Sequence, residues 1–229
     1  IIEFGNREKN AEKAGYTREK YDILKFLDNS IKLYKSAENK AELFKSTTND
    51  NEDKLIKENL AYACYYKGIV LVSLGRYEDA VKCFDESTSL SCDLDLLGEA
   101  SYEKGLSFHA KQNYNHAIIC FKEAKKYYKA HTIDDIEYTI DDIDIDDIEY
   151  TKSCLKTGES MYNSGKLHDA RIELKKLRRI FLDEIPNEKR KEEKGYKEAQ
   201  GQTSFILGLI KQKGYKEAQG QTSFILGLI

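Results

Sequence analysis

The side chains that could do chemistry are scattered along this 229-residue chain. No Ser or Cys stands in a nucleophile elbow, and no glycine-rich loop has the spacing that cradles a phosphate. The four histidines form no cluster with metal-ligand spacing, and they are His109, His116, His131 and His168. The five cysteines form no CxxC pair. The sequence therefore predicts that the protein is not an enzyme and that it holds no cofactor and no metal.

The cysteines are better explained by packing than by chemistry. Cysteine is a small apolar side chain that is usually buried when it is not in a disulfide or a metal site. An odd number of cysteines without paired spacing also argues against a disulfide framework. We therefore expect five buried thiols in a reducing cytoplasm, at Cys64, Cys83, Cys92, Cys120 and Cys154.

An acidic stretch is the best candidate for binding a cation. Residues 132–151 hold nine acids and no base. Asp142, Asp144 and Asp146 imitate the first ligands of a calcium-binding EF-hand loop. The resemblance fails because Asp147 stands at the glycine turn and the twelfth position is a serine instead of glutamate. We expect an acidic insertion that continues a helix with isoleucines along one face, and no calcium site.

Basic side chains gather after this insertion. The chain is neutral up to residue 131, and from residue 152 onward it holds 16 basic and 10 acidic residues. Arg171, Lys175 and Arg178 line one face of a predicted helix. Acids are interspersed and no aromatic side chains accompany the cations to stack on bases. We expect a solvated face and no specific nucleic acid, with an RNA-binding helical repeat as a less favoured alternative.

The composition favours helices over strands. One Pro and 14 Gly are too few for a turn-rich β protein. No apolar run approaches the roughly 18 residues that cross a bilayer. We expect a cytoplasmic protein without a membrane span, while the start at Ile1 leaves a removed signal peptide open.

One spaced pattern occurs three times. In each copy a glycine is followed by an alanine 12 residues later and by a large apolar residue 16 residues later. The three sets are Gly68, Ala80 and Phe84; Gly105, Ala117 and Phe121; and Gly158, Ala170 and Leu174. Spacings of three and four around the alanine predict one apolar stripe on a second helix. The first glycine marks a close approach of two helices.

The turns between these helices follow the same pattern. Gly75 and Gly165 fall where the first helix of a pair should end, as expected for a glycine at a helix C-terminus. Gln112 takes that place in the second copy.

These residues resemble the tetratricopeptide repeat (TPR) family across roughly 58–181. The resemblance implies an all-α fold of antiparallel helix-pair repeats stacked as a short TPR-like solenoid, an α–α superhelix. The chain departs from the family pattern in lacking the closing proline. It also has Cys64, Ser101 and Cys154 where the first helix usually carries a large aromatic residue.

The flanking regions complete the predicted domain organisation. Residues 1–57 form amphipathic helices, which we interpret as a decayed capping repeat with an apolar stripe at Tyr21, Leu24, Leu27 and Ile31. A loop is expected at Ser46–Asn51. Residues 58–181 are the repeats, with the acidic insertion at 132–151, and residues 182–229 are a duplicated helical segment.

The C-terminal region contains two copies of one segment with identical sequences. The sequence KGYKEAQGQTSFILGLI occupies 194–210 and again 213–229. Because old structural repeats diverge, this identity indicates a recent duplication or an artefact of sequence assembly. We interpret Phe205–Ile210 as the core of a first helix and Gly214 as the turn that follows it. Phe224–Ile229 should then be an apolar surface that needs cover.

The TPR resemblance also implies where a partner binds. A groove lined by the first helices would hold Tyr62, Tyr65, Tyr66, Ile69, Tyr102, Glu103, Leu106, His109, Lys152, Lys156, Glu159 and Tyr162. Tyrosine favours interfaces because it combines apolar area with a hydroxyl. We therefore expect a non-enzymatic protein–protein interaction scaffold or adaptor that binds a peptide or helix of another protein.

Two other functions remain open. A structural, self-associating protein would use the acidic insertion and the apolar C-terminus. A co-chaperone of the carboxylate-clamp type would use Lys152 and Lys156, which match the last two clamp positions. Glu103 disfavours the clamp because it would repel a carboxylate.

Overall fold

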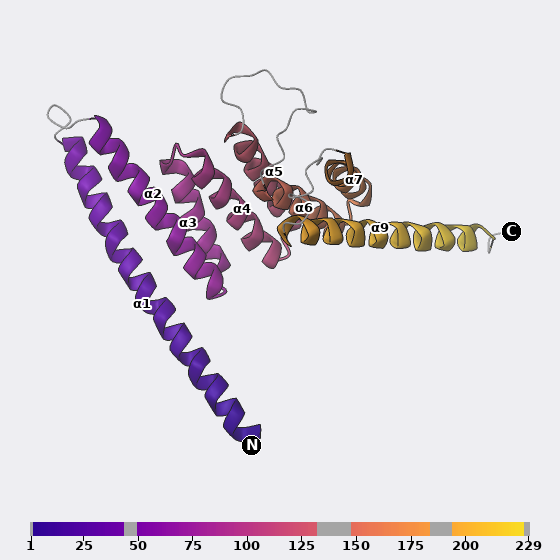
Figure 1. The fold of residues 1–229 in the computed structure, drawn as a ribbon, viewed down its shortest axis with the longest axis horizontal. Coiled ribbons are helices and arrows are strands. Elements are labelled where there is room, and N and C mark those ends of the chain that lie inside the picture. Colours follow the sequence, from indigo (N-terminus) through magenta and orange to yellow (C-terminus); the bar gives the residue numbers. More distant parts are fainter. Residues whose placement is uncertain (1, 44–49, 132–147, 184–193, 227–229) are drawn as a thin grey trace. The chain divides into compact units, whose positions relative to one another are not determined.

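The computed structural model describes residues 2–43, 50–131, 148–183 and 194–226, and within these ranges it contains helices and no strand. Figure 1 shows the helices in chain order. They are α1 (Ile2–Leu43), α2 (Asp50–Ser73), α3 (Tyr77–Leu90), α4 (Leu94–Ala110), α5 (Tyr114–His131), α6 (Ile148–Asn163), α7 (Leu167–Asp183) and α9 (Lys194–Leu226). The predicted all-α fold is confirmed.

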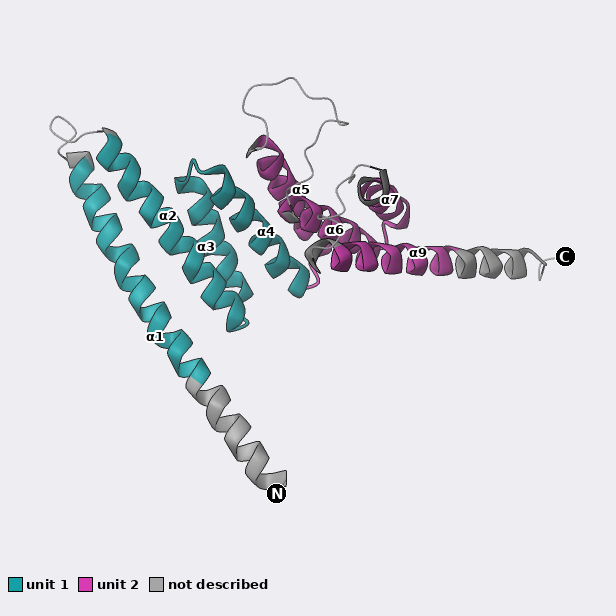
Figure 2. Cartoon of the chain, in the orientation of Figure 1, with its two compact units in different colours: residues 1–111 teal, residues 112–229 magenta. Residues whose placement is uncertain are grey.

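The chain divides into two compact units (Figure 2). Unit 1 comprises residues 1–111 and contains α1 to α4, and unit 2 comprises residues 112–229 and contains α5, α6, α7 and α9. The predicted domain boundaries at residues 57 and 181 stay predictions.

In unit 1, α2 and α3 form an antiparallel pair with the predicted close approach. A Cβ placed on Gly68 of α2 would lie 2.5 Å from Cε1 of Phe84 on α3. Phe84 and Ala80 are completely buried, as the predicted stripe requires. Cys64 is also completely buried, so a thiol fills the place that an aromatic ring would otherwise take. The glycine and the alanine therefore let the two helices pack around one phenylalanine ring.

Helix α1 packs along α2 and α3 with a narrower stripe than predicted. Leu24 and Ile31 are buried, whereas Tyr21 is 53% exposed. Ion pairs beside the stripe add contacts, because Lys67 Nζ lies 2.7 Å from Asp28 Oδ1 and Lys35 pairs with Glu86 of α3.

The loop predicted at Ser46–Asn51 extends two residues too far toward the C-terminus. Helix α2 begins at Asp50, so Asp50 and Asn51 are helical, and residues 46–49 lie outside the described residues. The first helix of the pair therefore starts eight residues before residue 58. Asp50, Glu52 and Asp53 in the first turn of α2 suit the positive end of the helix dipole.

In unit 2, α6 is the central helix and contacts α5, α7 and α9. Small side chains allow this, because Thr151, Ser153, Thr157 and Ser160 are completely buried. The hydroxyl of Thr157 donates to the carbonyl oxygen of Ser153 at 2.7 Å, which satisfies it inside its own helix.

The third predicted helix pair repeats the close contact of the first. A Cβ on Gly158 of α6 would lie 2.5 Å from Leu174 of α7. Ala170, Leu174 and Leu177 are buried along the predicted stripe. Of the acidic insertion, residues 132–147 lie outside the described residues, and α6 contains its last four residues.

The two glycine turns end their helices by the same hydrogen bonds. After α2, the N–H of Gly75 donates to the carbonyl of Val72 and that of Arg76 donates to Leu71, both at 2.9 Å. After α6, Gly165 and Lys166 repeat this pattern, at 3.1 and 2.9 Å. This is the Schellman motif, which needs a left-handed residue. The φ angles are 74° at Gly75 and 81° at Gly165, and Gln112 has a φ of 59° after α4.

The predicted turn at Gly214 is wrong, because α9 runs as one helix from Lys194 to Leu226. Lys211, Gln212 and Lys213 are good helix formers, and an exposed glycine within a helix costs only about 1 kcal/mol. The predicted core of Phe205–Ile210 is partly confirmed: Ile206 and Ile210 are buried, whereas Phe205 is 67% exposed. The side chains of Phe224–Ile229 lie outside the described residues.

Candidate interaction face

The predicted groove residues of α2 form an aromatic cluster in unit 1. Positions 62, 65, 66 and 69 lie within two turns of one helix, so their side chains share a face. The ring centroids of Tyr62 and Tyr66 lie 6.4 Å apart, and those of Tyr65 and Tyr66 lie 5.3 Å apart. Tyr66 is 53% exposed. Tyr65 packs against Phe84 of the core, with centroids 6.1 Å apart, and Ile69 joins the same core cluster.

Hydrogen bonds tie this cluster to the start of α4. The hydroxyl of Tyr62 donates to Oδ2 of Asp93 at 2.7 Å. Asp93 is the N-cap of α4, because its Oδ1 accepts from the N–H of Asp95 at 3.0 Å. Glu58 of α2 accepts from the hydroxyl of Ser91, which lies just before this cap. The tyrosines and the N-terminus of α4 therefore form one surface.

Nearby carboxylates and burial raise the pKa values of Tyr62 and Tyr65. The hydrogen bond to Asp93, with burial, raises the pKa of Tyr62 to about 12. Burial raises the pKa of Tyr65, and the nearby carboxylates of Glu99 and Glu103 raise it further. We name this surface the acidic tyrosine face: Glu58, Tyr62, Tyr65, Tyr66, Asp93, Glu99 and Glu103.

The predicted groove residues of α4 belong to the same unit. Helix α4 contacts α2, and Tyr102, Glu103, Leu106 and His109 are all half-buried on it. Lys104 forms an ion pair with Asp85 of α3, 2.5 Å away. Eight of the twelve predicted groove residues therefore lie on two contacting helices of unit 1.

The other four predicted residues lie on α6 of unit 2. Lys152 pairs with Glu149 at 2.6 Å, and Lys156 pairs with Glu159 at 2.7 Å. Tyr162 packs beside α9, with Nζ of Lys213 5.8 Å from its ring centroid. Both lysines of the suggested carboxylate clamp thus already have an acidic neighbour on their own helix.

Comparisons with known proteins give weak structural similarities only. A MamA RS-1 double mutant aligns at 18% identity and TM-score 0.40, over 77% of this chain and 94% of that chain. A putative kinesin light chain from Podosopora anserina with nearly identical TPR-like repeats aligns at 10% identity and TM-score 0.47, over 90% of each chain. MamA from Desulfovibrio magneticus RS-1 aligns at 17% identity and TM-score 0.41, over 82% and 96%. No family model and no curated protein matches the chain.

The fold is recognised from two helix pairs of the chain itself, α2 with α3 and α6 with α7. Gly68 with Phe84 and Gly158 with Leu174 make the same contact at the same spacing, and each pair is joined by the same glycine turn. The chain has a TPR-like helical-repeat fold.

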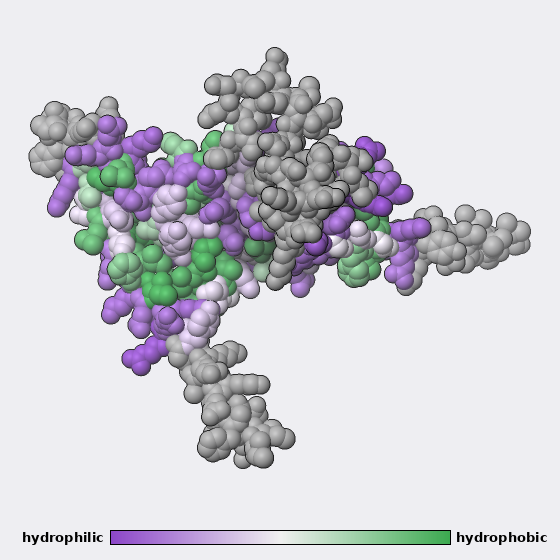
Figure 3. Space-filling model, in the orientation of Figure 1, coloured by the Kyte–Doolittle hydropathy of each residue, from purple (hydrophilic) through white to green (hydrophobic). Residues whose placement is uncertain are grey.

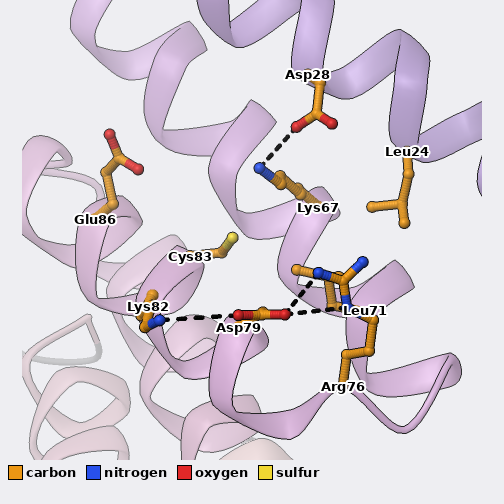
Figure 4. A pocket seen from close by; sticks show the side chains of 9 residues that line it. All are labelled: Leu24, Asp28, Lys67, Leu71, Arg76, Asp79, Lys82, Cys83 and Glu86. Atoms are coloured by element: carbon orange, nitrogen blue, oxygen red, sulfur yellow. Dashed lines mark hydrogen bonds and ion pairs between the residues drawn. The ribbon is translucent and has the colours of Figure 1, made fainter.

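A polar cleft lies in the TPR-like unit 1 where α1 meets the first helix pair (Figure 4). The charged side chains that line it pair with one another: Asp79 pairs with Arg76 at 2.6 Å and lies 3.8 Å from Lys82. Lys67 reaches across to Asp28 of α1. A ligand would have to break these pairs, so the cleft is best explained as the seam that holds α1.

A half-buried ionisable cluster lies in the TPR-like unit 2. Lys125 of α5 forms an ion pair with Glu173 of α7, and its Nζ lies 5.6 Å from the ring centroid of Tyr150. Burial would lower the pKa of Lys125, but Cys154 and Glu173 raise it on balance. Since burial raises the pKa of Cys154 to about 11, its thiol is neutral at pH 7 and Glu173 supplies the charge. The lysine therefore stays protonated and paired, which suits a structural role.

The other chemistry-bearing residues are spread over both units. His116 and His168 are exposed at the starts of α5 and α7, and Arg171, Lys175 and Arg178 are exposed on α7. Four of the five cysteines are buried as predicted, whereas Cys92 is exposed between α3 and α4. Among the described residues no group of His, Cys, Asp and Glu could hold a metal. Nor is any described helix long and apolar enough to cross a membrane.

Hydrophobic residues also gather over the middle of α1 and the C-terminal half of α2 (Figure 3). Phe26 of α1 is 69% exposed. The polar contacts here join α1 to α2: Lys20 Nζ donates to the carbonyl of Ser73 at 3.0 Å, and Lys67 pairs with Asp28.

Sequence reasoning identified the tyrosines but missed three of their acidic neighbours, Glu58, Asp93 and Glu99. Two signals could have found them. Asp93 precedes an apolar helix by one residue, as an N-cap does. Glu99 lies four residues before Glu103, so both carboxylates share one face of α4.

Proposed function

We propose that the chain is a non-enzymatic interaction protein and that the acidic tyrosine face binds a basic peptide or helix of another protein. The proposal rests on the tyrosine cluster of α2 with the carboxylates of Glu58, Asp93, Glu99 and Glu103 around it. Tyrosine rings offer apolar area and attract cations to their faces, and carboxylates pair with Lys and Arg. A ligand with both basic and apolar side chains matches this surface.

The ionisation of the face supports recognition rather than catalysis. A general acid or base works best with a pKa near the working pH. The pKa of Tyr62 is raised to about 12, and that of Tyr65 is raised as well. Their hydroxyls therefore stay protonated at neutral pH, where they act as hydrogen-bond donors.

A matched pair of tyrosine substitutions tests this function. Tyr66 and Tyr21 are both 53% exposed, but Tyr66 belongs to the face and Tyr21 lies on α1. The probe is a fluorescent amphipathic helical peptide carrying Lys and Arg beside Leu, with a Glu-for-Lys version as control. We expect Tyr66→Ala to weaken binding of the basic peptide about tenfold in fluorescence anisotropy, because exposed aromatic anchors dominate interfaces. Tyr65→Ala is unsuitable, since Tyr65 packs against Phe84.

Two results would contradict the proposal. One is equal weakening by Tyr66→Ala and Tyr21→Ala, and the other is equal binding of the basic and acidic peptides. Binding should also fall as salt rises, because salt screens the attraction between the carboxylates of the face and the basic peptide.

Self-association is a second candidate, supported by charge. Helix α7 exposes Arg171, Lys175 and Arg178 at spacings of four and three, so they form one basic stripe. Its positive charges match the carboxylates of the acidic tyrosine face. A second copy of the chain could therefore be the partner. Light scattering over a range of concentrations tests this: the mass should rise with concentration, and less so for Tyr66→Ala. A mass that stays monomeric throughout would eliminate this candidate.

A further inference from the structure

The first of the two identical C-terminal segments is docked on unit 2. Along α9, Ala199, Thr203, Ile206 and Ile210 are buried at spacings of four, three and four. We name these four residues the first docking stripe. Its apolar members form one core cluster with residues of α6 and α7, namely Cys154, Leu155, Met161, Ala170, Leu174 and Leu177.

The second segment carries the same stripe. The residues 19 positions later are Ala218, Thr222, Ile225 and Ile229, here named the second docking stripe. Helix α9 continues without a break from the first segment to Leu226. Over 19 residues a helix advances about 28 Å and turns by a net angle of about 100°. While the first stripe is docked, the second therefore cannot reach the same surface.

We propose that the surface of α6 and α7 accepts either stripe, so that residues 213–229 replace residues 194–210 in a second register of the same chain. The two stripes have the same residues, so their own contacts do not favour either register, whereas the contact of Lys213 with the ring of Tyr162 belongs to the first register alone. This inference is independent of the acidic tyrosine face, because every residue it uses lies in unit 2.

The two registers differ in the connection from α7. In the first register residues 184–193 join α7 to the docked segment, and in the second residues 184–212 do so. Joining two elements becomes less favourable with the three-halves power of the number of connecting residues, which for 10 against 29 residues is about fivefold. About one molecule in six should therefore hold the second register.

The rate at which a cysteine placed in either stripe is alkylated shows how often that stripe is undocked. The background is Cys92→Ser, which removes the exposed native thiol. In the full chain, Ala199→Cys should react only about sixfold more slowly than a fully exposed thiol, because the second register exposes it. Ile225→Asp with Ile229→Asp disables the second stripe and should slow that reaction further, although both residues are remote from position 199.

The reverse experiment disables the first stripe by Ile206→Asp with Ile210→Asp. We expect Ala218→Cys to become protected in this chain and unit 2 to stay folded, because the second stripe docks instead. A chain with all four aspartates gives the baseline in which neither stripe docks.

Three results would overturn the proposal. In the first, Ala199→Cys is protected far more than sixfold and the second-stripe aspartates leave it unchanged. In the second, Ala218→Cys reacts in the first-stripe variant as fast as in the chain with all four aspartates, which includes the case that unit 2 unfolds. In the third, the protection of Ala218→Cys in the first-stripe variant rises with protein concentration, because the second stripe would then dock on another chain.

Discussion

At the scale of single residues, burial is the main influence on the ionisable groups of the cores. Cys64 and Cys154 fill space beside the repeat glycines, and burial raises their thiol pKa values to about 12 and about 11. Both thiols replace the large aromatic residue of the TPR pattern. The packing role of these positions is therefore kept, and a dependence on pH is added.

The raised thiol pKa predicts a loss of stability in alkali. An unfolded thiol loses its proton near pH 8.5, whereas the pKa of buried Cys154 is about 11. The folded chain then binds more protons, so this contribution is complete below about pH 8.5 and is lost as the pH rises towards 11. We expect Cys154→Ala to remove about 3 kcal/mol of this decline in the free energy of unfolding. Urea unfolding across this pH range measures it, and parallel profiles for the two proteins would contradict it.

At the scale of elements, two helix pairs, α2 with α3 and α6 with α7, pack closely over a glycine. Gly68→Ala and Gly158→Ala each place a methyl group 2.5 Å from a buried side chain. We expect each to destabilise the chain by about 1–3 kcal/mol through overpacking. Gly201→Ala on α9 is the control, because no atom lies within 4 Å of its Cβ. It should stabilise the chain by about 0.5–1 kcal/mol through helix propensity. Equal effects of the three in thermal unfolding would exclude the contact as the cause.

The turns give a second prediction at this scale. Nothing lies within 4 Å of a Cβ on Gly75, yet its φ is 74°, so Gly75→Ala should cost about 1–2 kcal/mol from the backbone alone. Gln112 already has a φ of 59°, so Gln112→Gly should stabilise by up to about 1 kcal/mol. Urea unfolding should show a lower free energy of unfolding for Gly75→Ala and a higher one for Gln112→Gly. An unchanged free energy of unfolding for Gly75→Ala would argue against strain at this turn.

The helix pairs could be predicted from sequence, and the last helix could not. The pairs are specified locally: a glycine, an alanine and a large apolar residue at fixed spacing define one contact. Gly214 shows the limit, because glycine permits a turn but does not impose one. The stop at Gly75 also depends on the bonds that Gly75 and Arg76 make back to α2. After Ile210 the chain has helix formers, and α9 continues.

The acidic tyrosine face was only half predictable for a different reason. Its tyrosines lie on one helix, where spacing alone places them together. Asp93 is 31 residues from Tyr62 and reaches it only because α4 packs near α2. Such a contact depends on tertiary packing, which a single sequence pattern does not encode.

At the scale of the whole molecule, the two glycine contacts belong to different core clusters. Phe84 belongs to a cluster of unit 1 and Leu174 to a cluster of unit 2. Substitutions that share no partners usually add within about 0.5 kcal/mol. We therefore expect Gly68→Ala and Gly158→Ala together to lower the unfolding free energy by the sum of their separate effects. Calorimetry measures it, and a deficit or excess above about 1 kcal/mol would reveal coupling between the cores.

The exposed thiol of Cys92 offers a built-in optical probe. Cys92 lies between Ser91, which bonds Glu58, and Asp93, which bonds Tyr62, whereas the other four thiols are buried. A dye attached there would stand at the rim of the acidic tyrosine face without any change to the sequence. Its emission should respond when a ligand covers the rings, so the labelled chain with its native sequence could be screened against whole peptide collections in solution.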